Sequence, residues 1–402
     1  MKTLEANAHA FAGKRGEGVR SDCYVEIAAQ TSGGIRIEFQ SKVAALYGAQ
    51  IEQLAREACR FYAIEHGAIQ IEDGGALPFT LAARLEAAIK RAWPDRRAAL
   101  QLSQNIRTLS SSKKERLRRT RLYLPGNEPK FFVNAGLHAP DAIILDLEDS
   151  VAPSEKDAAR ILVRHALQHV DFREAERMVR INAGELGQAD LREVIPHGAQ
   201  TILIPKCESA EQVRLVAEVV DSICRQYELA HEIFFIPIIE SAAGVLRAFE
   251  IAQASDKNCG LAFGLEDYVA DLGAMKTAAG TESLFARSMV VNAAKAAGLQ
   301  ALDSVFADVN DAEGLQASTR AAKMLGFEGK GCIHPRQIRV IHEALAPSMQ
   351  EIEEAQRIVA AFEAAQQQGL GVVALGTKMI DAPVVKRAQQ ILESARRNNL
   401  IR

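Results

Sequence analysis

Eight short apolar runs between residues 121 and 335 place the strongest constraint on how this chain can fold. They end in polar residues suited to binding carboxylates, and segments with helical periodicity separate them. Eight repeats of strand followed by helix are the count of a (β/α)8 barrel, whose parallel strands are buried on both faces. The runs are residues 122–124, 142–146, 178–182, 202–206, 234–240, 261–264, 304–306 and 331–334.

The polar residues that follow these runs predict an active site. In a barrel of this kind the chemistry takes place at the carboxyl ends of the strands. Side chains at those ends are therefore expected to meet around one mouth. They are Arg180, Lys206, Glu240, Asp267, Asp308 and His334.

Composition excludes several functional classes. The net charge of -3 argues against a nucleic-acid-binding protein, and no apolar run is long enough to span a bilayer. Residues 1–14 lack the apolar core of a signal peptide, which predicts a cytoplasmic protein. The six cysteines have no short paired spacing, so we expect reduced side chains rather than a zinc site or a disulfide framework.

The remaining residues predict further domains. Residues 1–93 are expected to form a small α+β domain, with strands at 23–27, 35–39 and 68–71 and helices at 42–66 and 78–93. A polar, basic linker at 94–118, expected to be solvated, leads to the barrel at 119–347. Residues 348–402 are expected to form a helical lid, which covers the mouth of its own barrel or of a neighbour's.

Glu240 and Asp267 are candidates for metal ligands, because they follow consecutive predicted strands. Two carboxylates, completed by water and substrate oxygens, are a common way for a protein to hold Mg²⁺. The alternative is that each carboxylate caps a helix or pairs with Lys206 or an arginine.

Arg180 interrupts an otherwise apolar strand, and a buried arginine requires an anionic partner. Its planar guanidinium suits a substrate carboxylate. The alternative is a permanent ion pair with Asp146 or Glu148. The acidic cluster that these two residues form with Asp149 is suited either to metal-bound water or to the N-terminus of the next helix.

The region from about 118 to 348 closely resembles the citrate lyase beta-subunit family, which also includes malyl-CoA and citramalyl-CoA lyases. The resemblance implies that Glu240 and Asp267 bind Mg²⁺ and that Arg180 binds the 2-oxo-acid portion of the substrate. It also implies that Tyr123 and Lys130 contact a CoA-type thioester. The matching stretches are residues 122–127, 146–152, 179–182, 204–206, 239–241, 264–268 and 334–338.

The C-terminal segment at 379–383 looks like the lid of the malyl- and citramalyl-CoA lyases. In those enzymes the aspartate of the lid is an acid/base that reaches the neighbouring subunit's site, which makes Asp381 the candidate proton carrier. Its position beside Pro383 is equally that of a helix N-cap. The same resemblance implies a homotrimer or a multiple of one.

Residues 18–92 are similar to the acyl-carrier gamma subunit of citrate lyase, on the basis of residues 34–38, 41–43, 75–77 and 83–87. In that family a serine before an aspartate carries a phosphoribosyl-dephospho-CoA arm, and Ser21 occupies this position. The alternative is that Ser21 is only a polar residue ahead of the first strand. With an arm on Ser21, a flexible linker would keep the thioester near the barrel.

The expected function is a Mg²⁺-dependent carbon–carbon lyase that cleaves a 3-hydroxy-3-carboxyacyl thioester, on CoA or on a carrier, to an acyl thioester and a 2-oxo acid. A same-site alternative is thioester hydrolysis or malate-synthase-like condensation. A further alternative is a non-catalytic carrier or scaffold subunit for an acyltransferase partner.

Overall fold

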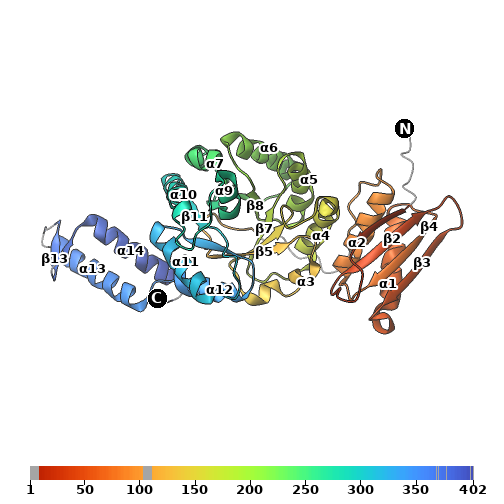
Figure 1. Ribbon diagram of the computed structural model, residues 1–402, viewed down its shortest axis with the longest axis horizontal. Coiled ribbons are helices and arrows are strands. Elements are labelled where there is room, and N and C mark those ends of the chain that lie inside the picture. Colours follow the sequence, from red (N-terminus) through yellow and green to blue (C-terminus); the bar gives the residue numbers. More distant parts are fainter. Residues whose placement is uncertain are drawn as a thin grey trace.

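The computed structural model describes residues 9–102, 111–367, 369, 371–376, 378–398 and 400–401. It has three parts along the chain, which we name the N-terminal unit (residues 9–92), the barrel (120–345) and the C-terminal hairpin (349–397). The N-terminal unit and the hairpin lie on opposite sides of the barrel (Figure 1). Two ranges lie outside the described residues. Residues 1–8 belong to the segment examined for a signal peptide, and residues 103–110 belong to the expected linker.

The N-terminal unit is a four-stranded sheet covered by two helices. The strand order is β1-β2-β4-β3, with β3 parallel to β4 and the other pairs antiparallel. Its elements are β1 (His9–Gly13), β2 (Cys23–Ala29), β3 (Ile35–Ser41), α1 (Ala44–Phe61), β4 (Gly67–Asp73) and α2 (Pro78–Ala92). The three expected strands and two expected helices are present.

Two details of this unit differ from expectation. Strand β1 was not predicted, because five residues at the edge of a sheet give too short an alternation to detect. Helix α1 ends at Phe61 rather than near His66, since Ala63 adopts a positive φ of 51° and ends the helical conformation.

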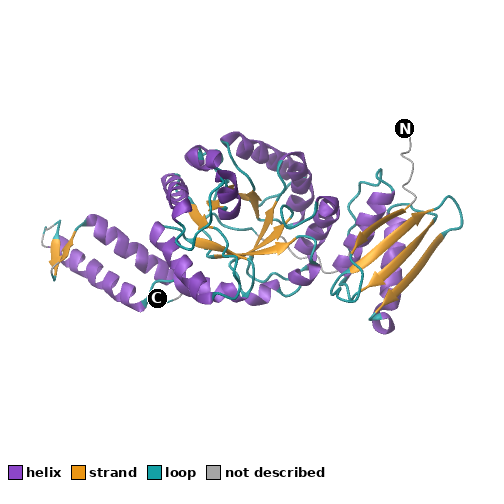
Figure 2. Cartoon of the chain, in the orientation of Figure 1, coloured by secondary structure: helices purple, strands orange, loops and turns teal. Residues whose placement is uncertain are grey.

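The barrel confirms the predicted fold class. Its eight parallel strands close in the order β10-β11-β12-β5-β6-β7-β8-β9, and helices surround them (Figure 2). The strands are β5 (Thr120–Pro125), β6 (Ala142–Asp146), β7 (Glu176–Arg180), β8 (Thr201–Ile204), β9 (Phe234–Ile239), β10 (Gly260–Phe263), β11 (Gln300–Asp303) and β12 (Gly329–Cys332).

The helices that follow the strands form the outer layer of the barrel. They are α3 (Pro129–Phe132), α4 (Lys156–His169), α5 (Gly184–Val194), α6 (Ala210–Gln226), α7 (Ala242–Leu246), α8 (Ala248–Ala252), α9 (Leu265–Leu272), α10 (Leu284–Ala296), α11 (Ala312–Leu325) and α12 (Arg336–Leu345). Short 3-10 turns occupy Ala135–His138, Pro153–Glu155, Ile195–His197 and Thr281–Ser283.

The seventh strand is not where the sequence predicted it. The expected run was 304–306, but β11 ends at Asp303 and residues 304–306 belong to the loop that follows. The error has a physical origin. Gln300 and Asp303 are polar, yet both are buried, and the Asp303 carboxylate accepts hydrogen bonds from Lys330 at 2.7 Å and from Arg287 at 3.0 and 3.1 Å.

The linker expectation fails where the chain enters the barrel. Arg118, expected in a solvated stretch, is 1% exposed and donates from Nε and Nη2 to the Glu176 carboxylate at 2.8 and 2.9 Å. The Ser112 hydroxyl donates to the same carboxylate at 2.6 Å. Glu176 is the first residue of β7, so this cluster closes the amino end of the barrel, opposite the mouth.

The C-terminal hairpin consists of α13 (Met349–Gln367), β13 (Val373–Leu375), β14 (Lys378–Ile380) and α14 (Ala382–Arg397). Within the expected helical lid, α13 is helical as far as Gln367, and Gln368 lies outside the described residues. The two helices pack on each other through a small apolar core that includes Ile352, Ala388 and Leu392.

All six cysteines are free thiols, as expected. No helix in the described ranges has the length and apolar character needed to cross a membrane.

Candidate active site

Arg180 ends β7 at the mouth and is surrounded by carboxylates from the end of β6 and from the loop that follows it. Its Nε and Nη2 donate to the two oxygens of Asp146, each at 2.7 Å, and Nη1 lies 2.9 Å from Glu148. Burial opposes the charged form of Arg180, but the hydrogen bonds and charge of Asp146 outweigh it and raise the pKa of Arg180. The alternative of an ion pair with Asp146 or Glu148 is therefore the arrangement observed.

Lys206, directly after β8, joins the same acidic cluster. Its Nζ lies 2.5 Å from Glu148 and 3.1 Å from Asp149. Partial desolvation acts in the opposite direction, but hydrogen bonds to Glu148 and Asp149 raise the pKa of Lys206. Lys206 has a positive φ of 48°, a conformation unfavourable for a residue with a side chain, and functional sites commonly hold such strain. The structure thus places Lys206 in the acidic cluster at the mouth.

Glu240 follows β9 and is buried at the mouth, 5% exposed, where its Oε1 accepts a hydrogen bond from the Lys206 backbone N–H at 2.6 Å. Burial raises the pKa of Glu240 to about 7, the Lys206 N–H acts against this rise, and the charge of nearby Asp267 adds to it. The end of β10 approaches so closely that a Cβ on Gly264 would lie 2.4 Å from Oε2 of Glu240. Glycine at 264 therefore leaves space for the carboxylate.

The charges at the mouth are unbalanced, which fits a metal ion. Five carboxylates face three basic side chains, Arg180, Lys206 and Lys156, whose Nζ donates to the carbonyls of Leu147 and Glu148. Asp267 lies in the first turn of α9 and forms no hydrogen bond or ion pair with any described residue. Across the described ranges no three His, Cys, Asp or Glu side chains are grouped to hold a metal by themselves. A pair of carboxylates completed by water and substrate suits Mg²⁺, which keeps several waters. The carboxylates are Asp146, Glu148, Asp149, Glu240 and Asp267.

The two residues predicted to contact the thioester lie in and after β5. Tyr123 faces the barrel interior, and the Arg180 guanidinium carbon is 5.4 Å from the centre of its ring. Burial raises the pKa of Tyr123, and the charges of Arg121 and Arg180 oppose this rise. Lys130 is exposed on α3, with its Nζ 3.2 Å from Glu128. Tyr123 thus lies beside the acidic cluster, whereas Lys130 stands on the first loop of the rim.

Asp308 and His334 do not join the cluster. Asp308 is exposed, and its carboxylate accepts a hydrogen bond from the N–H of Asn310 within its own loop at 2.9 Å. The predicted strand at 304–306 had placed Asp308 closer to the barrel end than it is. Nδ1 of His334 accepts from the Arg336 N–H at 3.1 Å, which satisfies the start of α12. His334 therefore has a role in the scaffold.

Asp381 lies at the tip of the hairpin, away from the mouth of its own barrel. It caps α14 by accepting from the Val384 N–H at 3.2 Å, as the helix-cap alternative predicted. The other end of α14 is attached to the amino end of the barrel, where Asn398 contacts Arg119 just before β5. The 16 residues of α14 span about 24 Å, and the hairpin extends away from the barrel (Figure 1).

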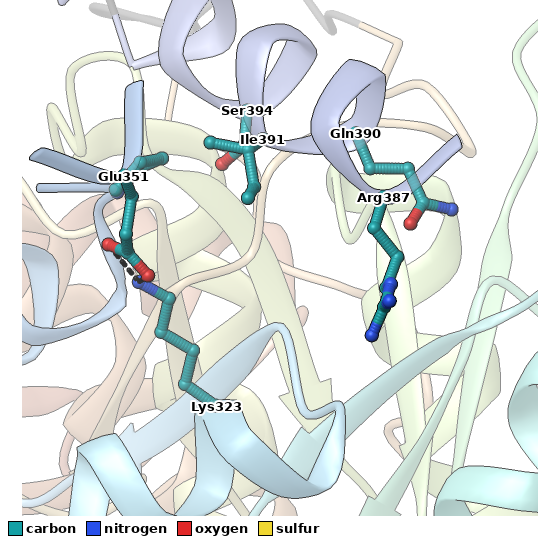
Figure 3. A pocket seen from close by; sticks show the side chains of 7 residues that line it. Lys323, Glu351, Arg387, Gln390, Ile391 and Ser394 are labelled. Atoms are coloured by element: carbon teal, nitrogen blue, oxygen red, sulfur yellow. Dashed lines mark hydrogen bonds and ion pairs between the residues drawn. The ribbon is translucent and has the colours of Figure 1, made fainter. Parts of the chain in front are cut away.

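The base of the hairpin contacts the outside of the barrel around a cavity of about 300 Å³ (Figure 3). Lys323, near the end of α11, pairs with Glu351 of α13 at 3.3 Å and donates to the carbonyl of Ala346 at 3.1 Å. Arg387, Gln390, Ile391 and Ser394 of α14 line the other side. This cavity belongs to the joint between hairpin and barrel, not to the mouth.

Ser21 lies in the loop between β1 and β2 with a positive φ of 57°. The next residue, Asp22, is buried and accepts hydrogen bonds from Nε and Nη2 of Arg84, both at 2.9 Å. Nη2 of Arg84 also donates to the carbonyl of Asn127, in the loop after β5, at 3.2 Å. Sequence reasoning missed this contact, because its partners are separated by 43 and 62 residues.

The fold and the mouth together define a barrel enzyme with an acidic, arginine-containing site. A family model described as HpcH/HpaI aldolase/citrate lyase matches residues 119–335, and another, C-C_Bond_Lyase of the TIM-barrel fold, matches 283–398. The chain belongs to the HpcH/HpaI aldolase/citrate lyase family and is a carbon–carbon lyase. Residues 10–92 match an acyl carrier protein model described as malonate decarboxylase delta subunit, which confirms a carrier-like N-terminal unit.

Named relatives support this placement. The chain is 42% identical to citrate lyase subunit beta of Haemophilus influenzae over 287 residues, which are 70% of this chain and 98% of the relative. It is 34% identical to mitochondrial citramalyl-CoA lyase of Mus musculus over 293 residues, 69% and 86% of the two chains. The crystal structure of CitE from Mycobacterium tuberculosis with magnesium, acetoacetate and coenzyme A superposes with a TM-score of 0.58 at 34% identity, covering 70% of this chain and 99% of that one.

Proposed function

We propose that this chain cleaves a 3-hydroxy-3-carboxyacyl thioester into an acyl thioester and a 2-oxo acid, with Mg²⁺ held by Glu240 and Asp267. The observation that carries the proposal is the mouth itself, where Glu240 lies near both Asp267 and Arg180 in an excess of negative charge. The related structures with magnesium and with coenzyme A support it.

Arg180 provides the binding site for the 2-oxo-acid carboxylate. Asp146 and Glu148 occupy part of its guanidinium, and an arginine has five N–H donors, so donors remain for a substrate. When bound, Mg²⁺ supplies Lewis-acid stabilisation of the substrate hydroxyl and its neighbouring carboxylate. The positive charge of Arg180 would stabilise the negative charge that the substrate hydroxyl oxygen gains as it loses its proton, before the carbon–carbon bond breaks and the charge passes to the thioester enolate.

Asp381 is the proposed proton carrier, and it acts in the mouth of a second copy of the chain. The breaking bond leaves an enolate of the thioester, whose carbon must take up a proton to give the acyl product. The hairpin base is fixed at the amino end of its own barrel, so its tip extends away from its own mouth. This geometry supports a homo-oligomer in which each hairpin completes a neighbour's site. Such an oligomer is consistent with the expected trimer.

Ser21 is the proposed attachment point for a phosphoribosyl-dephospho-CoA arm. The match of residues 10–92 to an acyl carrier model supports this assignment. The left-handed backbone at Ser21 is a further argument, because a non-glycine residue adopts it at a cost that functional positions often bear. A chain with this arm would act on carrier-bound substrate, and an acyltransferase subunit would be required to load it.

The metal assignment is tested by Glu240→Gln and Asp267→Asn, which keep the size of each side chain and remove its charge. Each should abolish Mg²⁺ binding in calorimetry and Mg²⁺-stimulated cleavage of citryl-, citramalyl- or malyl-CoA. Glu266→Gln is the matched control, because Glu266 precedes Asp267 but is exposed and paired with Lys276. Full Mg²⁺-stimulated turnover in either ligand variant would refute the assignment.

A further inference from the structure

The N-terminal unit is fixed to the barrel by a buried ion-pair cluster between α2 and α4. Arg164 donates from Nη1 to Oε1 of Glu86 at 2.9 Å and from Nη2 to Oε2, and Nε2 of His165 lies 3.2 Å from the same carboxylate. None of these three side chains is exposed. A bidentate arginine–carboxylate pair fixes orientation as well as distance. This pair supports a carrier unit that is held in place against the barrel, rather than one that moves on its linker.

Arg91, farther along α2, makes a second set of contacts with the barrel rim. It donates from Nε and Nη2 to the carboxylate of Asp157, at 2.7 and 2.6 Å, and to the carbonyl of Ser154 at 2.9 Å. Ser154 lies in the loop between β6 and α4, and Asp157 in the first turn of α4, so both are on the carboxyl side of the barrel. The N-terminal unit therefore packs along α4 on the side of the barrel, and its Arg91 contacts lie at the carboxyl side.

The loop that carries Ser21 lies against the first loop of the mouth. Arg84, 1% exposed, connects Asp22 to the carbonyl of Asn127. Beside it, Lys14 forms an ion pair with Glu128, which also pairs with Lys130 at 3.2 Å. The attachment loop thus contacts the segment that holds Lys130, the proposed thioester contact, through one ion pair, Lys14–Glu128, and through the hydrogen bond of Arg84 to the Asn127 carbonyl.

We propose that a group on Ser21 is delivered in cis, from this fixed position to the mouth of its own barrel, and that Arg84 is the positioning residue for delivery. The inference rests on the proposed function, because it requires the arm and the lyase site. It goes beyond that function by assigning the carrier to its own barrel. Only the arm moves, and its thioester is kept at high effective concentration at one mouth.

The test uses the condensing direction, in which the product stays on the protein. The acetyl carbon next to the thioester loses a proton and bonds to the keto carbon of a 2-oxo acid, whose oxygen takes up a proton. The chain therefore gains the whole mass of the 2-oxo acid. Protein from its native host is acetylated on the arm thiol, mixed with Mg²⁺ and oxaloacetate, pyruvate or glyoxylate, and followed by intact mass.

Mixed oligomers separate delivery in cis from delivery to a neighbour. Ser21→Ala chains, which lack the attachment point, are co-expressed with Glu240→Gln chains, which lack a metal ligand, and both are checked for unchanged melting temperature. Delivery in cis predicts that the wild-type chain gains the 2-oxo acid, while the Glu240→Gln chain in the mixed oligomer does not. The inference would be overturned if the Glu240→Gln chain gained the mass of the 2-oxo acid, or if the intact mass of the wild-type chain showed no arm.

Free acetyl-CoA distinguishes failure of this inference from failure of the proposed function. Wild-type protein that condenses free acetyl-CoA but not its own acetylated arm contradicts delivery in cis alone. Wild-type protein that condenses neither contradicts both.

Arg84→Lys tests the positioning role, because lysine keeps the charge but loses the planar fork that joins Asp22 to Asn127. We expect condensation on the arm to slow by at least about fivefold, with kcat and KM for free acetyl-CoA unchanged. Arg56→Lys is the matched control, since Arg56 pairs with Glu52 on the exposed face of α1. Unchanged reaction of the arm, or an equal decrease in both reactions, would overturn the role.

Discussion

Arg180 and Asp146 are joined by two parallel hydrogen bonds of 2.7 Å, which hold the guanidinium in one orientation at the mouth of the barrel. Asp146 is 2% exposed and accepts further N–H bonds from Glu148 and Ser150, so the pair is itself held by the loop after β6. Arg180 is therefore preorganised before any substrate arrives.

Asp146→Asn should weaken substrate binding by releasing Arg180 from this orientation. A charge-assisted hydrogen bond contributes about 1.5–3 kcal/mol, which corresponds to a rise of at least about tenfold in KM for the thioester. Steady-state kinetics measure the effect. Asp308→Asn is the control, because Asp308 is exposed and bonded within its own loop, and it should leave KM unchanged. Equal KM values for wild type and Asp146→Asn would show that Asp146 does not position Arg180.

The Asp381→Asn protein should have no turnover by itself. Turnover should return when it forms mixed oligomers with the Arg180→Ala protein. If Asp381 acts in a neighbour's mouth, an oligomer with Arg180→Ala contains sites in which an intact Arg180 meets an intact Asp381. The expected result is clear recovery of activity on mixing, measured with free CoA thioester, from two parents that are each inactive. No recovery in oligomers shown by mass to be mixed would place Asp381 in its own site or outside the chemistry.

The contact between the N-terminal unit and the barrel should weaken in acid. Burial, together with the charges of Arg164 and His169, lowers the pKa of His165 to about 4, while Glu86 opposes this decrease. Because this pKa lies below the ordinary value of 6.5, the stability it contributes is complete above pH 6.5 and is lost as the pH falls toward 4. The pKa of Glu86 is also lowered, so its protonation acts in the same direction.

Denaturant unfolding at a series of pH values measures this effect. His165→Gln should flatten the decrease in the free energy of unfolding between pH 6.5 and 4, whereas the exposed His138→Gln should not. A decrease of the same size in the His165→Gln protein would mean that other groups cause it.

Arg121→Met should stabilise the barrel. Arg121 is 1% exposed in β5, donates from Nη2 to the Asp303 carbonyl at 2.7 Å, and its Nε and Nη1 find no partner within the described part of the chain. Burial lowers the pKa of Arg121. Replacing poorly compensated buried charge with an apolar side chain often gains about 1–4 kcal/mol.

Urea unfolding measures this gain. Arg339→Met is the control, because Arg339 is 87% exposed and should change stability by less than about 0.5 kcal/mol. Loss of stability in Arg121→Met would indicate that Arg121 has a partner that stabilises its charge.

The sequence was sufficient to predict the barrel and many of the residues at its mouth. Seven of the eight strands overlap the apolar runs that predicted them, since parallel strands covered on both faces are mostly apolar. The prediction failed for the one remaining strand, β11, because Gln300 and Asp303 are polar and buried, with partners on other elements. A pattern of apolar and polar residues along one strand cannot reveal a buried carboxylate whose basic partners lie on other elements, here Arg287 on α10 and Lys330 on β12.

Two contacts between the parts of the chain could not be predicted, because each depends on residues far apart in sequence. The Glu86–Arg164 pair joins helices of different units, and each residue alone looks like an ordinary surface charge on an amphipathic helix. The attachment of the hairpin through Arg119 and Asn398 likewise decides that Asp381 extends away from its own mouth. Residue type identified these side chains as polar, and only the packing of distant segments determined their partners.

The most direct test of the central claim is a cleavage assay on the purified protein. Citryl-, citramalyl- and malyl-CoA are each incubated with Mg²⁺, with and without EDTA, while the acyl-CoA and the 2-oxo acid released are quantified. The proposed function predicts equal amounts of the two products from at least one substrate, and none with EDTA. Release of free CoA and a hydroxy acid, or cleavage that EDTA leaves unchanged, would contradict it.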